Sequence, residues 1–195
     1  MSFTGELAYE INVEGWLGRP MWEAVMAAGE PFGVTPYGTE AMHLLRAEKG
    51  FVIVGQDTDG TVTPGDLGMS WIVRKDDSDF VGRRSLSRPD TVRPDRKQLV
   101  GLLPVDPEAW LPEGAQMVAP GSVGMTPPVP MLGHVTSSYR SPTLGRTFAL
   151  AMVAGGRSLV GTRLMAPLPG GDIEAEVTAP VFYDERIERR DGGGA

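Results

Sequence analysis

Short apolar segments separated by glycine and proline fill the second half of this chain, and they restrict its possible folds more than any other feature. Each segment is short for a helix but long enough for a strand. The 26 glycines and 17 prolines among 195 residues supply turns between them. We therefore expect residues 97–187 to form a small antiparallel β-barrel. Its six strands are expected in LVGLLPV, EGAQMV, GHVTSS, TFALAMV, GTRLMAPL and IEAEVTAPVFY.

The beginning of the chain has a mixed pattern. Residues 2–13 alternate between apolar and polar side chains, which predicts a half-buried strand with Tyr9 directed toward a core or pocket. Residues 20–29 have an apolar face at helical spacing, with proline in the first turn. Residues 39–49 have a similar face and are followed by Gly50, a residue that commonly ends helices. We expect one strand and two helices here.

The middle of the chain connects these elements to the barrel. The apolar run FVIVG predicts a buried strand at residues 51–55, and GMSWIV predicts extended structure at residues 68–73. Residues 85–97 are charged and contain proline, as a linker does.

The predicted fold class is therefore α+β. We expect a mixed domain at residues 1–88, a barrel domain at residues 97–187 and a disordered tail at residues 188–195.

Charge and composition exclude several classes of function. The net charge of −7 has the wrong sign for an unassisted nucleic-acid or anionic-membrane binder. The absence of cysteine excludes disulfides, thiol nucleophiles and thiolate metal sites. His43 and His134 are the only histidines, so no metal site is expected. The chain also lacks the GxSxG, GxxxxGK[ST] and strand-linked GxGxxG motifs of serine hydrolases, phosphate-loop enzymes and dinucleotide binders.

The sequence also argues against a calcium site and against a secretion signal or membrane span. The loop with Asp57 and Asp59 resembles the start of a calcium loop, but Gly68 stands where that loop needs an acidic ligand. No segment resembles a secretion signal or reaches the length of an apolar membrane span, so we expect a cytoplasmic protein with neither membrane nor nucleic-acid partners.

Glu48 violates a local rule of helix chemistry. It falls in the last turn of the predicted helix at residues 39–49, where the helix dipole disfavours a carboxylate. Such violations can mark functional positions. The alternative is that Glu48 has no functional role and that Arg46, Lys49 or solvent neutralises its charge. Glu48 is therefore a candidate functional residue.

Several long motifs give the chain a specific resemblance. SFTGELAYEI, PFGVTPYGTEAMHLLRAEKGF, VGQDTDGTVTPGDLGMSW and DFVGRRSL resemble the folate-binding aminomethyltransferase family of the glycine cleavage T-protein. Within that family, TPYGTEAMHLLRAEKG and GQDTDGTVTP are most similar to the C-terminal region of heterotetrameric sarcosine oxidase alpha subunits. LVGLLPVDP, GHVTSSYRSPTLGRTFALAMV and VFYDERIERRDG extend the likeness through the barrel.

The resemblance implies a partial folate-binding aminomethyltransferase fold followed by the barrel. It also implies tetrahydrofolate as cofactor. In such sarcosine oxidases, the amine is oxidised to an iminium at a flavin in the beta subunit, and tetrahydrofolate in the alpha subunit captures the one-carbon unit. The products are glycine, hydrogen peroxide and 5,10-methylenetetrahydrofolate, or formaldehyde without folate. FAD, FMN and NAD belong to the parent complex and are not expected on this chain.

The resemblance also implies site residues. Glu48 matches the family's LR-x-E-x-G glutamate, whose carboxylate hydrogen-bonds the pterin edge. Arg74 and Lys75 are candidates for the basic residue that follows the tryptophan segment and helps to hold folate. Tyr183 matches the PFYD-like end of the barrel, and Tyr9 is a further candidate contact. Phe3 stands where the family often has a tyrosine.

The chain departs from the family pattern at its beginning, because Met1 directly precedes the SFTGE motif. The family's aspartate beside folate N10 lies upstream of that motif, so no catalytic residue is assigned here. We expect the isolated chain to be inactive and to need the upstream part of the alpha subunit and the flavin-containing beta subunit as partners.

Two alternatives remain beside the sarcosine oxidase reading. One is a fragment of a T-protein-like aminomethyltransferase or folate-dependent demethylase. The other is a noncatalytic assembly module that docks through the barrel and the exposed edge of residues 2–11.

Overall fold

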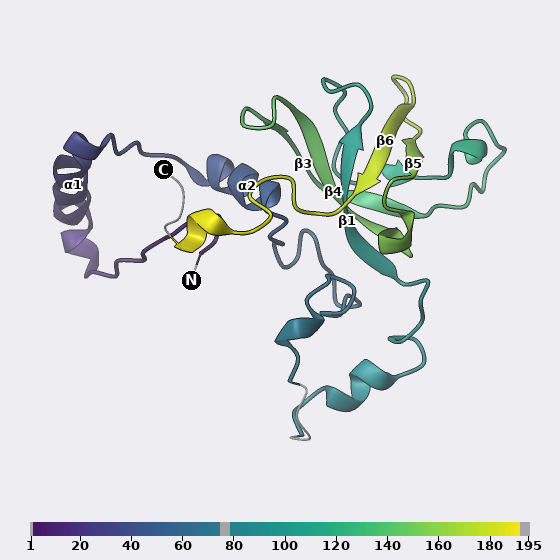
Figure 1. The fold of residues 1–195 in the computed structure, drawn as a ribbon, viewed down its shortest axis with the longest axis horizontal. Coiled ribbons are helices and arrows are strands. Elements are labelled where there is room, and N and C mark those ends of the chain that lie inside the picture. The colour runs from purple at the N-terminus through teal and green to yellow at the C-terminus, as the bar shows by residue number, and fades with distance from the viewer. Residues whose placement is uncertain (1, 75–78, 192–195) are drawn as a thin grey trace.

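A six-stranded antiparallel barrel forms the second half of the molecule (Figure 1). The computed structural model describes residues 2–74 and 79–191. The strands are ordered β2-β3-β4-β1-β6-β5, and an antiparallel bridge between Val118 and Met165 joins the two edges. The predicted barrel is therefore confirmed. The strands are β1 (Lys97–Pro104), β2 (Gln116–Met117), β3 (Gly133–Ser141), β4 (Arg146–Ala154), β5 (Arg163–Ala166) and β6 (Ile173–Thr178).

Strand alternation divides the apolar residues into two cores. In β1, Val100 and Leu102 belong to the cluster inside the barrel, whereas Leu99 belongs to a second cluster on its outer surface. In β4, Ala149 belongs to the inner cluster and Phe148 to the outer one. Successive side chains of a strand point to opposite faces, so β1 and β4 contribute to both cores.

Both predicted helices are present. Helix α1 spans Gly18–Gly29, and α2 spans Thr39–Glu48. The end of α2 packs on the barrel, with Ala47 fully buried in the outer cluster. Gly50 ends the turn with φ of 70°, and a Cβ there would lie 2.6 Å from the Pro180 carbonyl oxygen. Glycine at position 50 thus lets the C-terminal segment approach α2.

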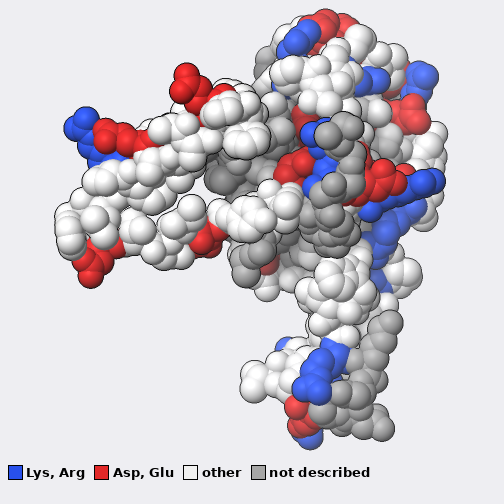
Figure 2. Space-filling model, turned by 60° about the vertical axis from the view of Figure 1, so that its left-hand side comes forward, with Lys and Arg blue, Asp and Glu red and all other residues white. Residues whose placement is uncertain are grey.

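The N-terminal segment, residues 2–6, contacts Lys49 at the end of α2, and the N-terminal arm, residues 7–38, projects from the barrel and carries α1 (Figure 1). Its apolar side chains are largely exposed, including Trp16 at 74% and Phe32 at 87%. In Figure 2 the arm is a mostly uncharged projection. It also contains the 3₁₀ turns η1 (Gly15–Leu17) and η2 (Glu30–Phe32).

The predicted strand at residues 2–13 is wrong, and so is the inward direction of Tyr9, which is 85% exposed. Alternating side chains favour a strand, but a strand also needs a hydrogen-bonding neighbour. Residues 2–13 pair with none in the described ranges.

The connecting segment also differs from expectation. Residues 51–55 form no strand, because the backbone turns after Ile53, whose carbonyl accepts from the Gln56 and Asp57 amides. Residues 68–73 contain a 3₁₀ turn, η3 (Ser70–Ile72), held by local hydrogen bonds. The predicted linker begins in another such turn, η4 (Arg83–Ser87).

Three further 3₁₀ turns complete the described chain: η5 (Pro120–Ser122), η6 (Gly156–Leu159) and η7 (Glu188–Asp191). The last lies within residues 188–195, the tail that the sequence predicts to be disordered. Hydrogen bonds from the Glu188 and Arg189 amides to the Asp184 carboxylate hold this turn. None of the helices in the described ranges is long and apolar enough to cross a bilayer.

Candidate functional site

Four parts of the chain meet around a cavity of about 330 Å³ beside the barrel. They are the N-terminal segment, the end of α2, the turn between β3 and β4, and the C-terminal segment. The cavity combines carboxylates, cations, hydroxyls and an aromatic ring. Its lining residues are Thr4, Glu6, Leu45, Glu48, Lys49, Thr143, Tyr183 and Arg189.

Glu48 supplies a carboxylate to this cavity from the last turn of α2. The residue is only 2% exposed, and Ser141 Oγ donates to its Oε1 at 2.5 Å. Burial raises the pKa of Glu48, and the nearby Glu6 adds to this, whereas Ser141 and Lys49 oppose it. The Glu48 backbone carbonyl accepts from the amides of Phe182 and Tyr183 at 2.8 and 3.0 Å. The C-terminal segment therefore satisfies the helix end that holds the carboxylate.

Lys49 ties the two ends of the described chain together beside Glu48. Its Nζ lies 2.9 Å from Glu6 Oε1 and 2.8 Å from Asp184 Oδ2, and it donates to the Gly5 carbonyl at 3.1 Å. Burial lowers the pKa of Lys49, but the hydrogen bonds to Asp184 and Glu6 outweigh burial and raise it. A Cβ at Gly5 would lie 2.3 Å from Lys49 Cδ, so this approach requires glycine.

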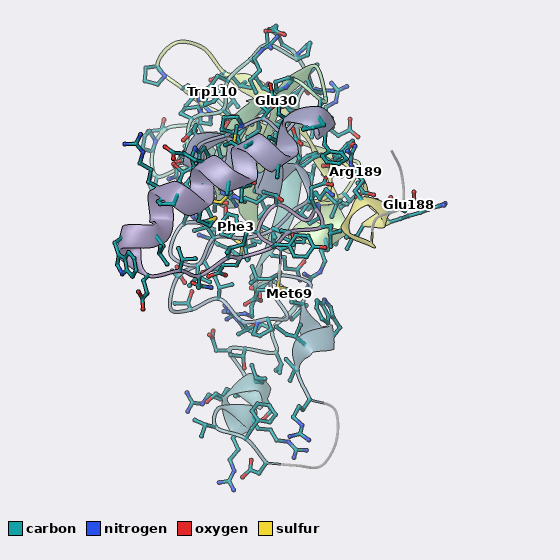
Figure 3. The ribbon with its side chains drawn as sticks, turned by 90° about the vertical axis from the view of Figure 1, so that its left-hand side faces the viewer. Phe3, Glu30, Met69, Trp110, Glu188 and Arg189 are labelled. Atoms are coloured by element: carbon teal, nitrogen blue, oxygen red, sulfur yellow. The ribbon has the colours of Figure 1, made fainter. Side chains whose placement is uncertain are left out.

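Tyr183 and Arg189 form another wall of the cavity. Arg189 Nη1 donates to the Tyr183 hydroxyl at 2.7 Å, and Arg189 Nε lies 3.2 Å from Glu6 Oε2. Lys49 Nζ lies 5.7 Å from the centre of the Tyr183 ring. Arg189 lies on the C-terminal turn in Figure 3, and these contacts connect that turn to the N-terminal segment.

The structure brings two of the five predicted binding residues together, because Glu48 and Tyr183 line the same cavity. Tyr9 is on the arm and does not line it. Arg74 is exposed and lines a separate cavity formed by the connecting segment. Lys75 lies outside the described residues. Phe3 is half-exposed, with its ring centre 6.5 Å from that of His43.

Besides the Lys49–Asp184 pair, two other largely buried ion pairs were not predicted from the sequence. Arg46 pairs with Asp57 at 2.5 Å, and Arg96 pairs with Asp66 at 2.7 Å. The partners are separated by 11 and 30 residues, so no local spacing rule links them. The described residues contain no cluster of three or more His, Asp or Glu side chains arranged to hold a metal ion.

The side chains around the Glu48 cavity can bind a flat heterocycle that has adjacent hydrogen-bond donors along one edge. A carboxylate has two oxygens that accept hydrogen bonds, and the 2-amino and N3 groups of a pterin are two adjacent donors. The Tyr183 ring and the aliphatic Leu45 side chain add apolar surface to the same cavity. The residues present therefore fit the pterin end of a folate.

Family models match both halves of the chain. The model of the GCVT N-terminal domain matches residues 1–77, and that of the glycine cleavage T-protein C-terminal barrel domain matches residues 97–184. The second match coincides with the observed barrel.

Curated relatives agree with these models. The chain is 57% identical to a sarcosine oxidase subunit alpha of Corynebacterium sp. (strain P-1), over 98% of this chain and 20% of that protein. It is 39% identical to the same subunit of Rhizobium meliloti (strain 1021), over 97% of this chain and 19% of that protein. It is 30% identical to an aminomethyltransferase of Clostridium botulinum (strain Okra / Type B1), over 96% of this chain and 48% of that protein. The chain thus spans about a fifth of the first two relatives and about half of the third.

A solved structure shares the fold. The glycine cleavage system aminomethyltransferase T from Bartonella henselae superposes with a TM-score of 0.73 and 24% identity, over 87% of this chain and 45% of that one. The fold, both domain matches and the identities lead to one conclusion. The chain belongs to the glycine cleavage T-protein family of aminomethyltransferases, and within it is similar to the alpha subunit of sarcosine oxidase.

Proposed function

We propose that this chain provides folate-binding residues to a sarcosine-oxidising enzyme, with Glu48 recognising the pterin. The observation that carries the proposal is the buried Glu48 carboxylate, which lines a cavity beside Tyr183. The 57% identity to a sarcosine oxidase subunit alpha favours this enzyme class over a free-standing aminomethyltransferase, for which the identity is 30%.

The chain's own residues would bind and orient the folate. Glu48 would accept hydrogen bonds from the pterin edge through its carboxylate, while Ser141 holds Oε1 in place. Tyr183 would pack against the ring, and Lys49 would keep the N-terminal and C-terminal segments closed around the cavity. Bound tetrahydrofolate would supply the nitrogen nucleophiles that capture a one-carbon unit. Arg74 stays a candidate contact only for a part of the ligand outside this cavity.

The whole reaction would couple two conversions. Sarcosine loses two electrons to a flavin, dioxygen takes those electrons and becomes hydrogen peroxide, and the released one-carbon unit joins tetrahydrofolate as 5,10-methylenetetrahydrofolate while glycine leaves. We propose that FAD, FMN and NAD are held by other parts of the complex. No residue of this chain is assigned to bond breaking.

The N-terminal arm is the proposed contact with the upstream part of the alpha subunit. Its exposed apolar side chains, among them Trp16, Trp22 and Phe32, offer surface for such a partner. Contact with the flavin-containing beta subunit, the division into domains 1–88 and 97–187, and a cytoplasmic location remain predictions from the sequence.

Calorimetric titration with tetrahydrofolate, under anaerobic conditions, tests the proposal. Glu48→Gln and Glu48→Ala should each weaken binding about tenfold or more, which corresponds to about 1.4 kcal/mol. Glu40→Gln is the matched control, because Glu40 is an exposed glutamate in the first turn of the same helix. No binding by the folded wild-type chain, or equal weakening in the Glu40 variant, would contradict the proposal.

A further inference from the structure

Arg46 is a completely buried cation at the end of α2, outside the cavity that holds Glu48. Its Nη1 pairs with Asp57 Oδ2 and donates to the Phe51 carbonyl at 2.9 Å. Its Nη2 donates to Ser137 Oγ at 2.7 Å and to the Tyr139 hydroxyl at 3.3 Å. The guanidinium therefore joins the helix both to the segment that follows it and to strand β3.

Asp57 completes this network from the other side. Its Oδ2 accepts from the Ile53 amide at 2.8 Å, and its Oδ1 accepts from the Thr136 and Ser137 hydroxyls, each at 2.6 Å. The pairing of β3 with β4 shifts register between Val135 and Ser137. A bulge of this kind breaks the alternation of side chains. It brings two consecutive hydroxyls to one carboxylate.

Glu48 lies two residues beyond Arg46 in the same helical turn, and it also contacts β3. Ser137 binds the Arg46 side chain, and Ser141, farther along the same strand, donates to Glu48. The last turn of α2 is thus attached to β3 at two points. An Arg fork that bonds in several directions at once fixes orientation more tightly than a single contact does.

We infer that Arg46 is a positioning residue for Glu48: its buried network with Asp57 and β3 fixes the last turn of α2, and so aims the Glu48 carboxylate into the cavity. The inference rests on the proposed function, because the carboxylate's position matters for folate only if Glu48 binds the pterin. Binding groups need such support from packed neighbours to hold a productive geometry.

The second buried ion pair provides a matched control. Arg96 donates to both oxygens of Asp66 through Nε, but these residues line a different cavity, between the connecting segment and the barrel. Asp66→Asn breaks an ion pair whose side chains are only 10% and 6% exposed, and the side-chain hydrogen bonds of this pair do not involve α2.

The experiment measures two properties of each folded variant: the pKa of Glu48, from carboxyl ¹³C NMR, and the affinity for tetrahydrofolate. The groups around Glu48 are Ser141 from β3, Lys49 from the helix end, Glu6 from the N-terminal segment, and Tyr183 and Arg189 from the C-terminal segment. Glu48→Gln identifies the NMR signal.

Arg46→Lys keeps a cation beside Asp57 but loses the fork to β3. We expect water to reach Glu48, so that its pKa falls toward the ordinary value, and affinity to fall about tenfold, as when a group supporting a ligand residue is removed. Ser137→Ala removes the hydroxyl that accepts from Arg46 and Gln56 and donates to Asp57. It leaves the Arg46–Asp57 pair in place, so it should change both properties in the same direction by less. It also provides the test if Arg46→Lys does not fold.

Unchanged Glu48 pKa and affinity in both variants, with lowered melting temperatures, would overturn the inference. Equal changes in Asp66→Asn would overturn it too. If the wild-type chain binds no tetrahydrofolate, the proposed function fails, while the Glu48 pKa still decides whether Arg46 positions the carboxylate.

Discussion

The barrel and the N-terminal arm use similar apolar residues with opposite results. In the barrel, Leu102 and Phe148 are fully buried, because strands on either side and the covering α2 enclose them. In the arm, Trp16 and Phe32 are mostly exposed, although α1 forms as its pattern predicts. An apolar stripe at helical spacing therefore predicts that a helix forms. Whether its side chains are buried depends on a second surface that packs against them. Stability of this chain should come from the barrel and its junction with α2.

Leu102→Ala is the change in the barrel with the largest expected effect. It removes a large side chain from the closed core and should lower the free energy of unfolding by about 2–5 kcal/mol. Urea unfolding followed by circular dichroism measures this change. A loss below about 1 kcal/mol would show that the barrel core is loosely packed and does not differ from the arm in the way described above.

Asp66→Asn tests the junction between the connecting segment and the barrel, with an expected loss of about 1–3 kcal/mol at neutral pH. Burial alone would raise the pKa of Asp66, but the hydrogen bonds from Arg96 and Thr63 outweigh it and lower the pKa. The difference in free energy of unfolding between the wild type and Asp66→Asn should therefore be complete above pH about 3.8. It should decline as the pH falls through the lowered pKa of Asp66. Unfolding free energies of both proteins between pH 7 and 3 check this. A difference that stays constant with pH would exclude the ionised pair as its source.

Glu48→Gln should change the free energy of unfolding by less than Asp66→Asn does, and in the opposite direction. Burial raises the pKa of Glu48 above its ordinary value of 4.5, so ionised Glu48 opposes folding. The favourable contribution of Glu48 is complete below pH about 4.5 and is lost as the pH rises through the raised pKa. The variant should thus be more stable than wild type at pH 7, and the gain should shrink at pH 4. Thermal unfolding at both pH values provides the measurement, and a less stable variant at pH 7 would contradict it.

Trp16→Ala should have the smallest effect, below about 0.5 kcal/mol, because the ring is already exposed. Chymotrypsin should cleave at aromatic residues of the arm before it cleaves the barrel. Urea unfolding and mass spectrometry of the fragments measure these effects. A loss of unfolding free energy as large as that of Leu102→Ala would mean that the arm is packed in solution. The arm and the barrel would then not differ in burial.

The candidate site was partly predictable from the sequence. Glu48 was found because a carboxylate at a helix C-terminus is locally unfavourable and because it matches a family motif. Tyr183 came from the motif alone. Arg189 was missed because its segment has no apolar periodicity, and its order depends on Tyr183 and Glu6. Asp57 looked like a failed calcium ligand, whereas its partners come from α2 and β3.

The sequence by itself determined the elements whose signals are local. The Gly and Pro spacing placed the six strands, and apolar periodicity with Gly50 placed α2, since these signals act between near neighbours. Only the tertiary structure decided which partners meet. It gave residues 2–13 no pairing strand among residues 2–74 and 79–191, joined Arg46 to Asp57, and brought both ends of the described chain to Lys49. Burial and ion pairing depend on groups distant in sequence, and their geometry exists only once the barrel has closed.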